Sequence, residues 1–141
     1  MDMGKIHTSI TITNRIDQAN AETGLIPPEK VRSVTLPDVL VDTGATTLCL
    51  PREVITQLGL LPLRAVPVET ARGVAESHIY RDASISLLGR EGTFECLELP
   101  GGKQPLLGVI PLEALGIEPD LRSQTLRLLP LTEQDTYLTI L

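Results

Sequence analysis

The sequence is poor in aromatic residues and has no long hydrophobic run. Only 2% of its 141 residues are aromatic, although 42% are hydrophobic. The core must therefore be built from Leu, Ile and Val, and β-branched residues favour sheets. No apolar segment is long enough to cross a bilayer, and the opening MDMGKIHTSITITN lacks the apolar stretch of a signal peptide. We therefore expect a soluble, cytoplasmic protein.

Clusters of basic residues and of metal ligands are also missing. The 12 Lys and Arg residues are outnumbered by 18 Asp and Glu residues, and no basic run offers the positive surface of a partner for nucleic acids or anionic membranes. Cys49 and Cys96 stand far apart in no CxxC pattern, and His7 and His78 have no neighbours at metal-ligand spacing. We expect two free, buried thiols, no metal and no other cofactor.

In the first half of the chain, alternating apolar and polar residues predict two strands, and a segment between Pro51 and Gly59 predicts a helix. Residues 6–12 (IHTSITI) have the period of a half-buried strand, and the polar residues 14–29 that follow are interpreted as a long loop. A second strand is expected over residues 31–42, with Pro37 marking an edge or a bulge. Residues 51–60 (PREVITQLGL) predict a short helix that begins at Pro51 and ends at Gly59.

The second half predicts more strands and one further helix. Residues 65–88 predict a β-hairpin whose turn is Ala71, Arg72 and Gly73, and TFECLEL predicts the next strand. The segment PLLGVIPLEALGI has the glycine turn and short helix already seen after residue 42. QTLRLLPL and TYLTIL predict two last strands. No linker divides the chain, so we expect residues 1–141 to form a single, mainly β domain with one or two short helices.

One acidic residue, Asp42, stands in the otherwise uncharged run VLVDTGATTLCLP. A carboxylate at the end of a buried strand loses solvation, and hydrogen bonds or a partner must offset that cost. The Gly-Ala turn offers backbone N–H groups, and Thr43 offers a hydroxyl that could lock the loop to a neighbour. The plainer alternative is an Asp that caps an ordinary turn between strands.

The order of these parts resembles the retropepsin-type (retroviral-like) aspartic proteases. Two aliphatic residues precede Asp-Thr-Gly-Ala, and a short helix, a glycine-tipped hairpin and Leu-Leu-Gly before a second helix follow. The resemblance implies a closed β fold in which Asp42 is the catalytic acid and the hairpin is a flap over the substrate. It implies that Leu106, Leu107 and Gly108 pack beside the active-site loop. It also implies that substrate contacts come from the following residues: Thr43, Gly44, Ala45, Thr46, Arg72 and Gly73.

The chemistry of peptide hydrolysis predicts a homodimer. Without a metal or a covalent nucleophile, one carboxylate takes a proton from water while another donates one to the amide. No other Asp in the chain is followed by Thr-Gly or Ser-Gly. The second acid should therefore come from a second copy of the chain, placed by a twofold axis. The sequence thus predicts an aspartic endopeptidase that acts on peptides or proteins.

Several residues depart from the viral pattern. Thr46 and Thr47 replace acidic residues, and Val109 replaces the Arg that would pair with them, so the terminal strands are the candidates for stabilising a dimer. Arg72 at the hairpin tip either meets substrate or is merely solvated. A non-catalytic peptide-binding or dimerisation module on the same fold is the main alternative function. A phosphoryl-transfer loop has little support, because no phosphate-binding glycine loop or second acid lies nearby.

Overall fold

Nine strands and three short α-helices follow one another along residues 5–130, the part of the chain that the computed structural model describes. The strands are β1 (Ile6–Asn14), β2 (Ser33–Val41), β3 (Leu48–Leu50), β4 (Leu61–Thr70), β5 (Gly73–Leu87), β6 (Arg90–Glu98), β7 (Leu106–Leu107), β8 (Ile117–Asp120) and β9 (Thr125–Leu128). The helices are α1 (Arg15–Glu22), α2 (Arg52–Leu58) and α3 (Val109–Leu115), with a 3-10 turn at Pro28–Lys30.

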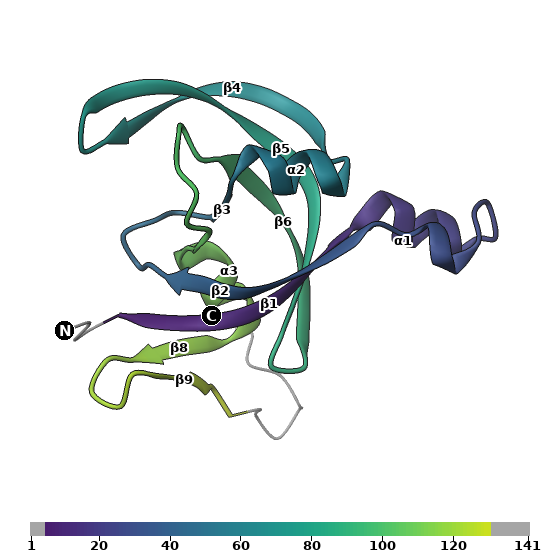
Figure 1. Ribbon diagram of the computed structural model, residues 1–141. Coiled ribbons are helices and arrows are strands. Elements are labelled where there is room, and N and C mark those ends of the chain that lie inside the picture. Colours follow the sequence, from purple (N-terminus) through teal and green to yellow (C-terminus); the bar gives the residue numbers. More distant parts are fainter. Residues whose placement is uncertain (1–4, 131–141) are drawn as a thin grey trace, which may run out of the picture.

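Seven strands form one sheet that closes on itself. Their order is β1-β2-β7-β3-β6-β5-β4, and β1 also pairs with β5, so the sheet closes around the core and leaves β4 at its edge (Figure 1). The core consists almost entirely of aliphatic side chains, as the scarcity of aromatic residues requires. Its fully buried members include Ile10, Ile12, Leu48, Leu50, Leu58, Ile85, Leu107 and Leu115. The predicted mainly β, closed fold is therefore confirmed.

The irregularity that Pro37 predicts lies in β2. Thr8 pairs with Val39 but Ile10 pairs with Leu36, so β2 carries one extra residue opposite β1 at this point. A bulge here leaves room for Pro37, which has no N–H to donate to the ladder. The prediction of a bulge is confirmed. Beyond the bulge, β2 runs straight into Asp42.

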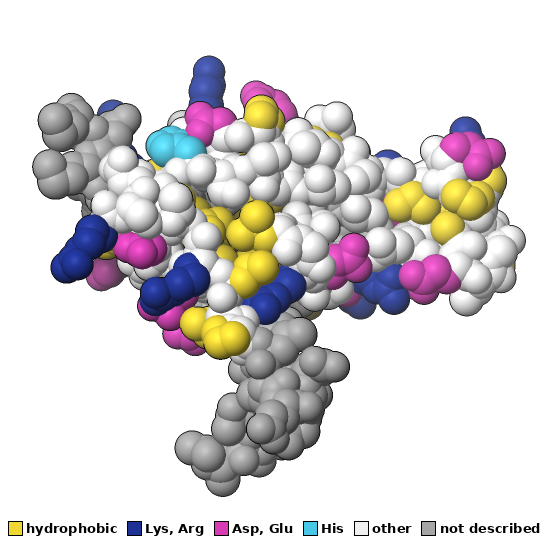
Figure 2. Space-filling view, turned by 90° about the horizontal axis from the view of Figure 1, so that it is seen from below, with side chains coloured by type: hydrophobic (Ala, Val, Ile, Leu, Met, Phe, Trp, Pro, Cys, Tyr) yellow, Lys and Arg dark blue, Asp and Glu magenta, His cyan; other side chains and the backbone are white. Residues whose placement is uncertain are grey.

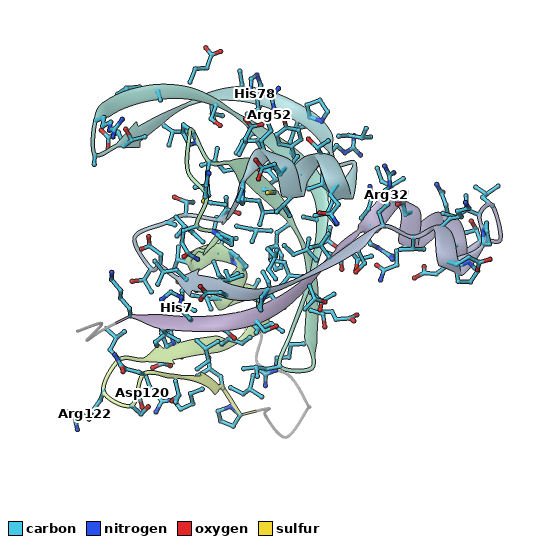
Figure 3. All side chains as sticks on the ribbon, in the orientation of Figure 1. His7, Arg32, Arg52, His78, Asp120 and Arg122 are labelled. Carbon is cyan, nitrogen blue, oxygen red and sulfur yellow. The ribbon has the colours of Figure 1, made fainter. Side chains whose placement is uncertain are left out.

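The interpretation of residues 14–29 as a long loop is wrong, because its first half is helix α1. The Asn14 side chain caps this helix by accepting a hydrogen bond from the backbone N–H of Asp17. Asp17 is 8% exposed and accepts hydrogen bonds from Nε and Nη2 of Arg32, at 2.8 and 3.0 Å, and from the Arg32 backbone N–H. These contacts fold residues 15–32 into a projecting lobe, the α1 lobe, and Figure 3 shows Arg32 near its base.

The surface seen from below mixes acidic and basic side chains, as Figure 2 shows. Apolar side chains are visible at the outer end of the α1 lobe (Figure 2), and Leu25, which follows α1 in the sequence, is 75% exposed. No helix within residues 5–130 is long and apolar enough to span a membrane.

The expected strand QTLRLLPL contains β9, which pairs with β8 in a separate two-stranded sheet. Sequence analysis did not identify β8, because Pro119 and two acidic residues hide its strand character. The expected strand TYLTIL lies outside the described residues.

Asp17→Asn should lower the free energy of unfolding by about 1–3 kcal/mol at pH 7, because it removes the charge of the buried partner from a hydrogen-bonded, partly exposed ion pair. The Arg32 hydrogen bonds lower the pKa of Asp17 from its usual value. Because the folded pKa is the lower one, this stabilisation is present above the unfolded pKa of about 4 and is lost as pH falls through the folded value. Urea unfolding at pH 7 and pH 3 measures both effects.

Glu22→Gln is the matched control on the same helix. The Glu22 carboxylate forms an ion pair with Arg15, but the Glu22 side chain is 60% exposed. The free energy of unfolding of this variant should therefore change by less than about 0.5 kcal/mol. If the Asp17→Asn deficit were the same at pH 7 and pH 3, the ion-pair explanation would be wrong.

Candidate active site

The loop that carries Asp42 is held at its base by strand pairing. Strand β7 pairs in parallel with the end of β2 and antiparallel with the start of β3. The loop of residues 42–47 therefore leaves and re-enters the sheet on either side of β7. The backbone N–H of Asp42 continues this pairing by donating to the carbonyl of Leu107 at 3.0 Å. The position of Asp42 is thus set by three strands.

The start of α3 holds the other end of the loop. The N–H groups of Val109 and Ile110 donate to the carbonyls of Ala45 and Thr46, both at 2.9 Å. These N–H groups lie in the first turn of the helix, where no intrahelical acceptor exists. Gly108 passes so close that a Cβ atom there would lie 2.4 Å from the Thr47 carbonyl oxygen. Leu106, Leu107 and Gly108 therefore pack beside the loop, as the family resemblance implies.

The Asp42 carboxylate is half-buried and bound by its own turn. The N–H of Gly44 donates to Oδ1 at 2.9 Å, and the N–H of Ala45 donates to the Asp42 carbonyl. Thr43 makes no side-chain hydrogen bond to any residue between 5 and 130, so it does not lock the loop within the chain. Thr47 does so instead, because its hydroxyl donates to the Glu95 carbonyl on β6.

Asp42 lines a cleft of about 970 Å³. The cleft lies between the loop, β6 and the hairpin formed by β4 and β5. Of the residues expected at the site, Asp42, Gly44, Ala45 and Thr46 line this cleft. The other lining residues are Thr47, Cys49, Arg64, Val66, Pro67, Val68, Glu69, Thr70, Ile79, Thr93, Phe94, Glu95, Leu97, Leu99, Pro100, Leu106 and Ile110. Thr43, Arg72 and Gly73 are not among them.

The hairpin of β4 and β5 arches over the rest of the sheet (Figure 1), and residues of β4 line the cleft. Strand β5 pairs with β6 from Ile79 onward, so residues 73–78 of β5 pair only with β4. The turn itself is closed by the Thr70 hydroxyl, which donates to the carbonyl of Gly73 at 2.8 Å. Gly73 has a φ of +110°, which explains the glycine, and Arg72 is exposed at the tip. The predicted hairpin and its turn are confirmed.

Sequence analysis missed the charged residues on the walls of the cleft. Arg64 on β4 donates to both carboxylate oxygens of Glu95 on β6, at 3.3 and 3.4 Å. Glu69 also lines the cleft and has no ion-pair or hydrogen-bond partner among the described residues. The local sequence could not predict the pairing of Arg64 with Glu95, because 31 positions separate the two residues.

The two cysteines are free, and both are buried as expected. Cys49 lines the same cleft as Asp42, and burial, with a smaller contribution from the Asp42 charge, raises the pKa of its thiol to about 11. Burial also raises the pKa of Cys96. Both thiols are therefore protonated at neutral pH and cannot act as thiolate nucleophiles. No group of three or more His, Cys, Asp or Glu residues able to hold a metal ion occurs within residues 5–130.

Comparison with known proteins agrees with this geometry. Residues 31–114, more than half of the chain, match the family described as "gag-polyprotein putative aspartyl protease", and the chain belongs to this family of retroviral-like aspartyl proteases. The fold is similar to that of EIAV protease complexed with the inhibitor HBY-793, with a TM-score of 0.51 and 20% sequence identity. That match covers 79% of this chain and 88% of the viral one. No curated protein sequence matches the chain.

Gly108→Ala should lower the free energy of unfolding by at least about 2 kcal/mol, because the new methyl group would overlap backbone atoms of Ala45 and Thr47. Gly102→Ala is the matched control, since its Cβ would meet only the Leu99 side chain, at 3.2 Å. Thermal or urea unfolding of both variants measures the difference. Equal stability of the two variants would show that the loop does not need this close approach.

Proposed function

We propose that the chain is an aspartic endopeptidase whose active site is formed by two copies of Asp42, one from each subunit of a homodimer. The observation that carries this proposal is a half-buried carboxylate on the floor of a large cleft, on a loop that three strands and a helix hold in place. Membership of the aspartyl protease family supports it. No cofactor is required.

The reaction needs one carboxylate as a base and one carboxyl group as an acid. The ionised member takes a proton from water as the water attacks the peptide carbonyl, and the protonated member donates its proton toward the amide. Two close carboxyl groups share one proton at moderate pH, because both cannot ionise side by side. The dyad then titrates as a coupled pair rather than as two separate groups.

The acids within one chain are poor candidates for the second carboxyl group. Glu95 lines the same cleft, but Arg64 donates hydrogen bonds to both of its carboxylate oxygens. Glu69 lies on β4, part of the hairpin that overhangs the cleft, rather than on its floor. A second copy of the chain can supply an Asp42 in the same environment, so a twofold axis through the loop satisfies the chemistry.

A partner would approach the side of the molecule on which the loop is exposed. The hairpin tip, the loop between β2 and β3, the β8–β9 turn and the start of β1 all lie on one side, the left in Figure 1. Thr43, Gly44 and Thr46 are exposed there. The expected pairing of terminal strands across the axis would have to use the remaining edges of β9 and of the first half of β1. Strand β8 already pairs with β9, β2 pairs with β1, and β5 pairs with β1 from Thr11 onward.

The hairpin would act as a lid over the substrate. Its outer part is two-stranded, exposed and held by few contacts other than its own, which gives a low free energy of local opening. An extended peptide beneath it would be anchored by Gly44, Thr46 and Thr47 and by backbone groups. Arg72 remains available to a substrate that extends beyond the cleft.

Asp42→Asn should reduce peptide cleavage by at least about 100-fold, because the amide can neither accept the proton of water nor share one with its partner. The control is Asp38→Asn, which makes the same change on β2, four residues before Asp42 and outside the cleft, and should retain activity. A chelator should have no effect on either protein. The measurement is initial rate on a peptide library between pH 3 and 8, and full activity of Asp42→Asn would overturn the proposal.

A further inference from the structure

A pair of charged side chains, Arg64 and Glu95, interrupts a mostly aliphatic face of the cleft. In the ladder of β4, β5 and β6, Arg64 lies opposite Ile79, and Ile79 lies opposite Leu97. Side chains of directly opposite residues project from the same face of a sheet, and so do those of residues two positions apart on one strand. These three residues and Glu95, two positions before Leu97, therefore share one face, and all of them line the cleft. The same face of β4 carries two more aliphatic lining residues, Val66 and Val68.

The other acid on β4, Glu69, belongs to the opposite face of the hairpin. It lies an odd number of positions from Arg64 and directly opposite Val74, which is 71% exposed. Asp42 apart, Arg64 and Glu95 are therefore the charged side chains that face the cleft within residues 5–130. A peptide in the cleft meets one ion pair among aliphatic groups.

Arg64 has hydrogen-bond donors that its partner does not use. Its Nη1 donates to Oε1 of Glu95 and its Nη2 to Oε2, at 3.3 and 3.4 Å. The Nε–H and the second N–H of each terminal nitrogen have no acceptor within residues 5–130, and the side chain is 53% exposed. An acceptor oxygen on a ligand can therefore bind Arg64 without breaking the pair, whereas a ligand cation would have to compete with Arg64 for Glu95.

The position of the pair relative to the catalytic loop is fixed through Glu95. The Thr47 hydroxyl, at the end of the loop that carries Asp42, donates to the Glu95 backbone carbonyl at 2.9 Å. The Glu95 side chain on the same residue then accepts from Arg64 on the hairpin. One residue thus connects the loop, the wall of the cleft and the base of the hairpin.

The pair lies at the end of the cleft that is remote from the hairpin tip. Arg64 is about 20 Å along β4 from Thr70 at the turn, at about 3.3 Å per residue. The tip lies on the side from which a partner would approach, the left in Figure 1. A substrate residue beside the pair is therefore several positions away from the bond that is cleaved near the axis.

We propose that Arg64, oriented by Glu95, is a specificity-determining residue that binds a substrate side chain with an acceptor oxygen (Gln, Asn, Glu or Asp) at an outer position of the peptide. This inference rests on the proposed function, because the substrate must lie in the same cleft. In a twofold dimer the second copy of Arg64 makes the same contact on the other side of the cleaved bond.

The test uses peptides with one apolar core and with Gln, Glu, Leu or Lys placed in turn at each outer position. The wild-type protein should show a kcat/KM about 2- to 5-fold higher for Gln and Glu than for Leu and Lys at one or more of these positions, the range for an exposed polar contact. Equal rates at every outer position, or a preference for Lys, would overturn the inference and leave the proposed function standing.

Single variants of the pair should shift the preference in opposite directions. Glu95→Gln removes the charge that competes for Arg64, so the preference for Glu over Lys should increase. Arg64→Gln leaves the Glu95 carboxylate without its cation, so the preference should reverse toward Lys. A hairpin that was merely destabilised would lower the rates of all peptides alike. If both variants kept the wild-type order of peptides, Arg64 would not determine specificity.

Arg15→Gln and Glu22→Gln are the matched controls. They make the same two changes in an ion pair on the α1 lobe whose side chains are 38 and 60% exposed and do not line the cleft. Both variants should keep the wild-type order of peptides. A shift as large as that of the Arg64 and Glu95 variants would show a general effect of net charge and contradict the inference.

A binding measurement separates the inference from the proposed function. Fluorescence anisotropy of labelled Gln and Lys peptides with the Asp42→Asn variant reports the cleft without any cleavage. Tighter binding of the Gln peptide, lost when Arg64→Gln is added, would support the inference even if the wild-type protein cleaved nothing. Equal binding of both peptides would refute it.

Discussion

The close approach of Gly108 to the loop is the constraint on which the site depends. A backbone without a Cβ lets the chain pass within van der Waals distance of Ala45 and Thr47 and start a helix directly beneath them. The first N–H groups of α3 then find their acceptors in the loop, and β7 completes the sheet on the other side. These contacts are between backbone atoms, and the Thr47 hydroxyl adds one side-chain hydrogen bond from the loop to β6.

A rigid loop with one acid explains why the proposed catalyst needs two chains. The Asp42 carboxylate accepts a hydrogen bond from the N–H of Gly44, and within residues 5–130 the other acids that line the cleft lie on β4 and β6 rather than on the loop. Two identical loops facing each other across an axis would present two carboxylates in the same environment. The Arg64–Glu95 pair on the cleft wall would then be doubled as well.

The sequence predicted the strands and the helix whose pattern and ends are marked by residues close together in the chain. Alternation identified β1, β2 and the hairpin, and the proline and glycine boundaries identified α2, whose last turn ends at Gly59 with a φ of +63°. The run from β2 into Asp42 was specific enough to indicate both the family and the loop. These signals need no information about distant residues.

Features that depend on distant contacts could not be predicted in the same way. Helix α1 is short and polar, and the ion pair of Asp17 with Arg32 that holds it spans 15 positions. The cleft is lined by residues of both β4 and β6. The sequence alone could not show that Arg64, Glu69 and Glu95 border the same cleft, because that depends on where the two strands lie. Arg72 and Gly73 were expected beside the substrate because they form the turn, yet the lining comes from the strand that precedes it.

The sharing of one site by two chains is tested most directly by mixing subunits. Wild-type and Asp42→Asn chains, combined in equal amounts and allowed to exchange, form about one quarter fully wild-type dimers if pairing is random. Activity should fall to about half of that of the wild-type chains alone, because only half of those chains keep a wild-type partner. Brief mixing without exchange should lose nothing. Unchanged activity after proven exchange would place both catalytic acids within one chain and contradict the account.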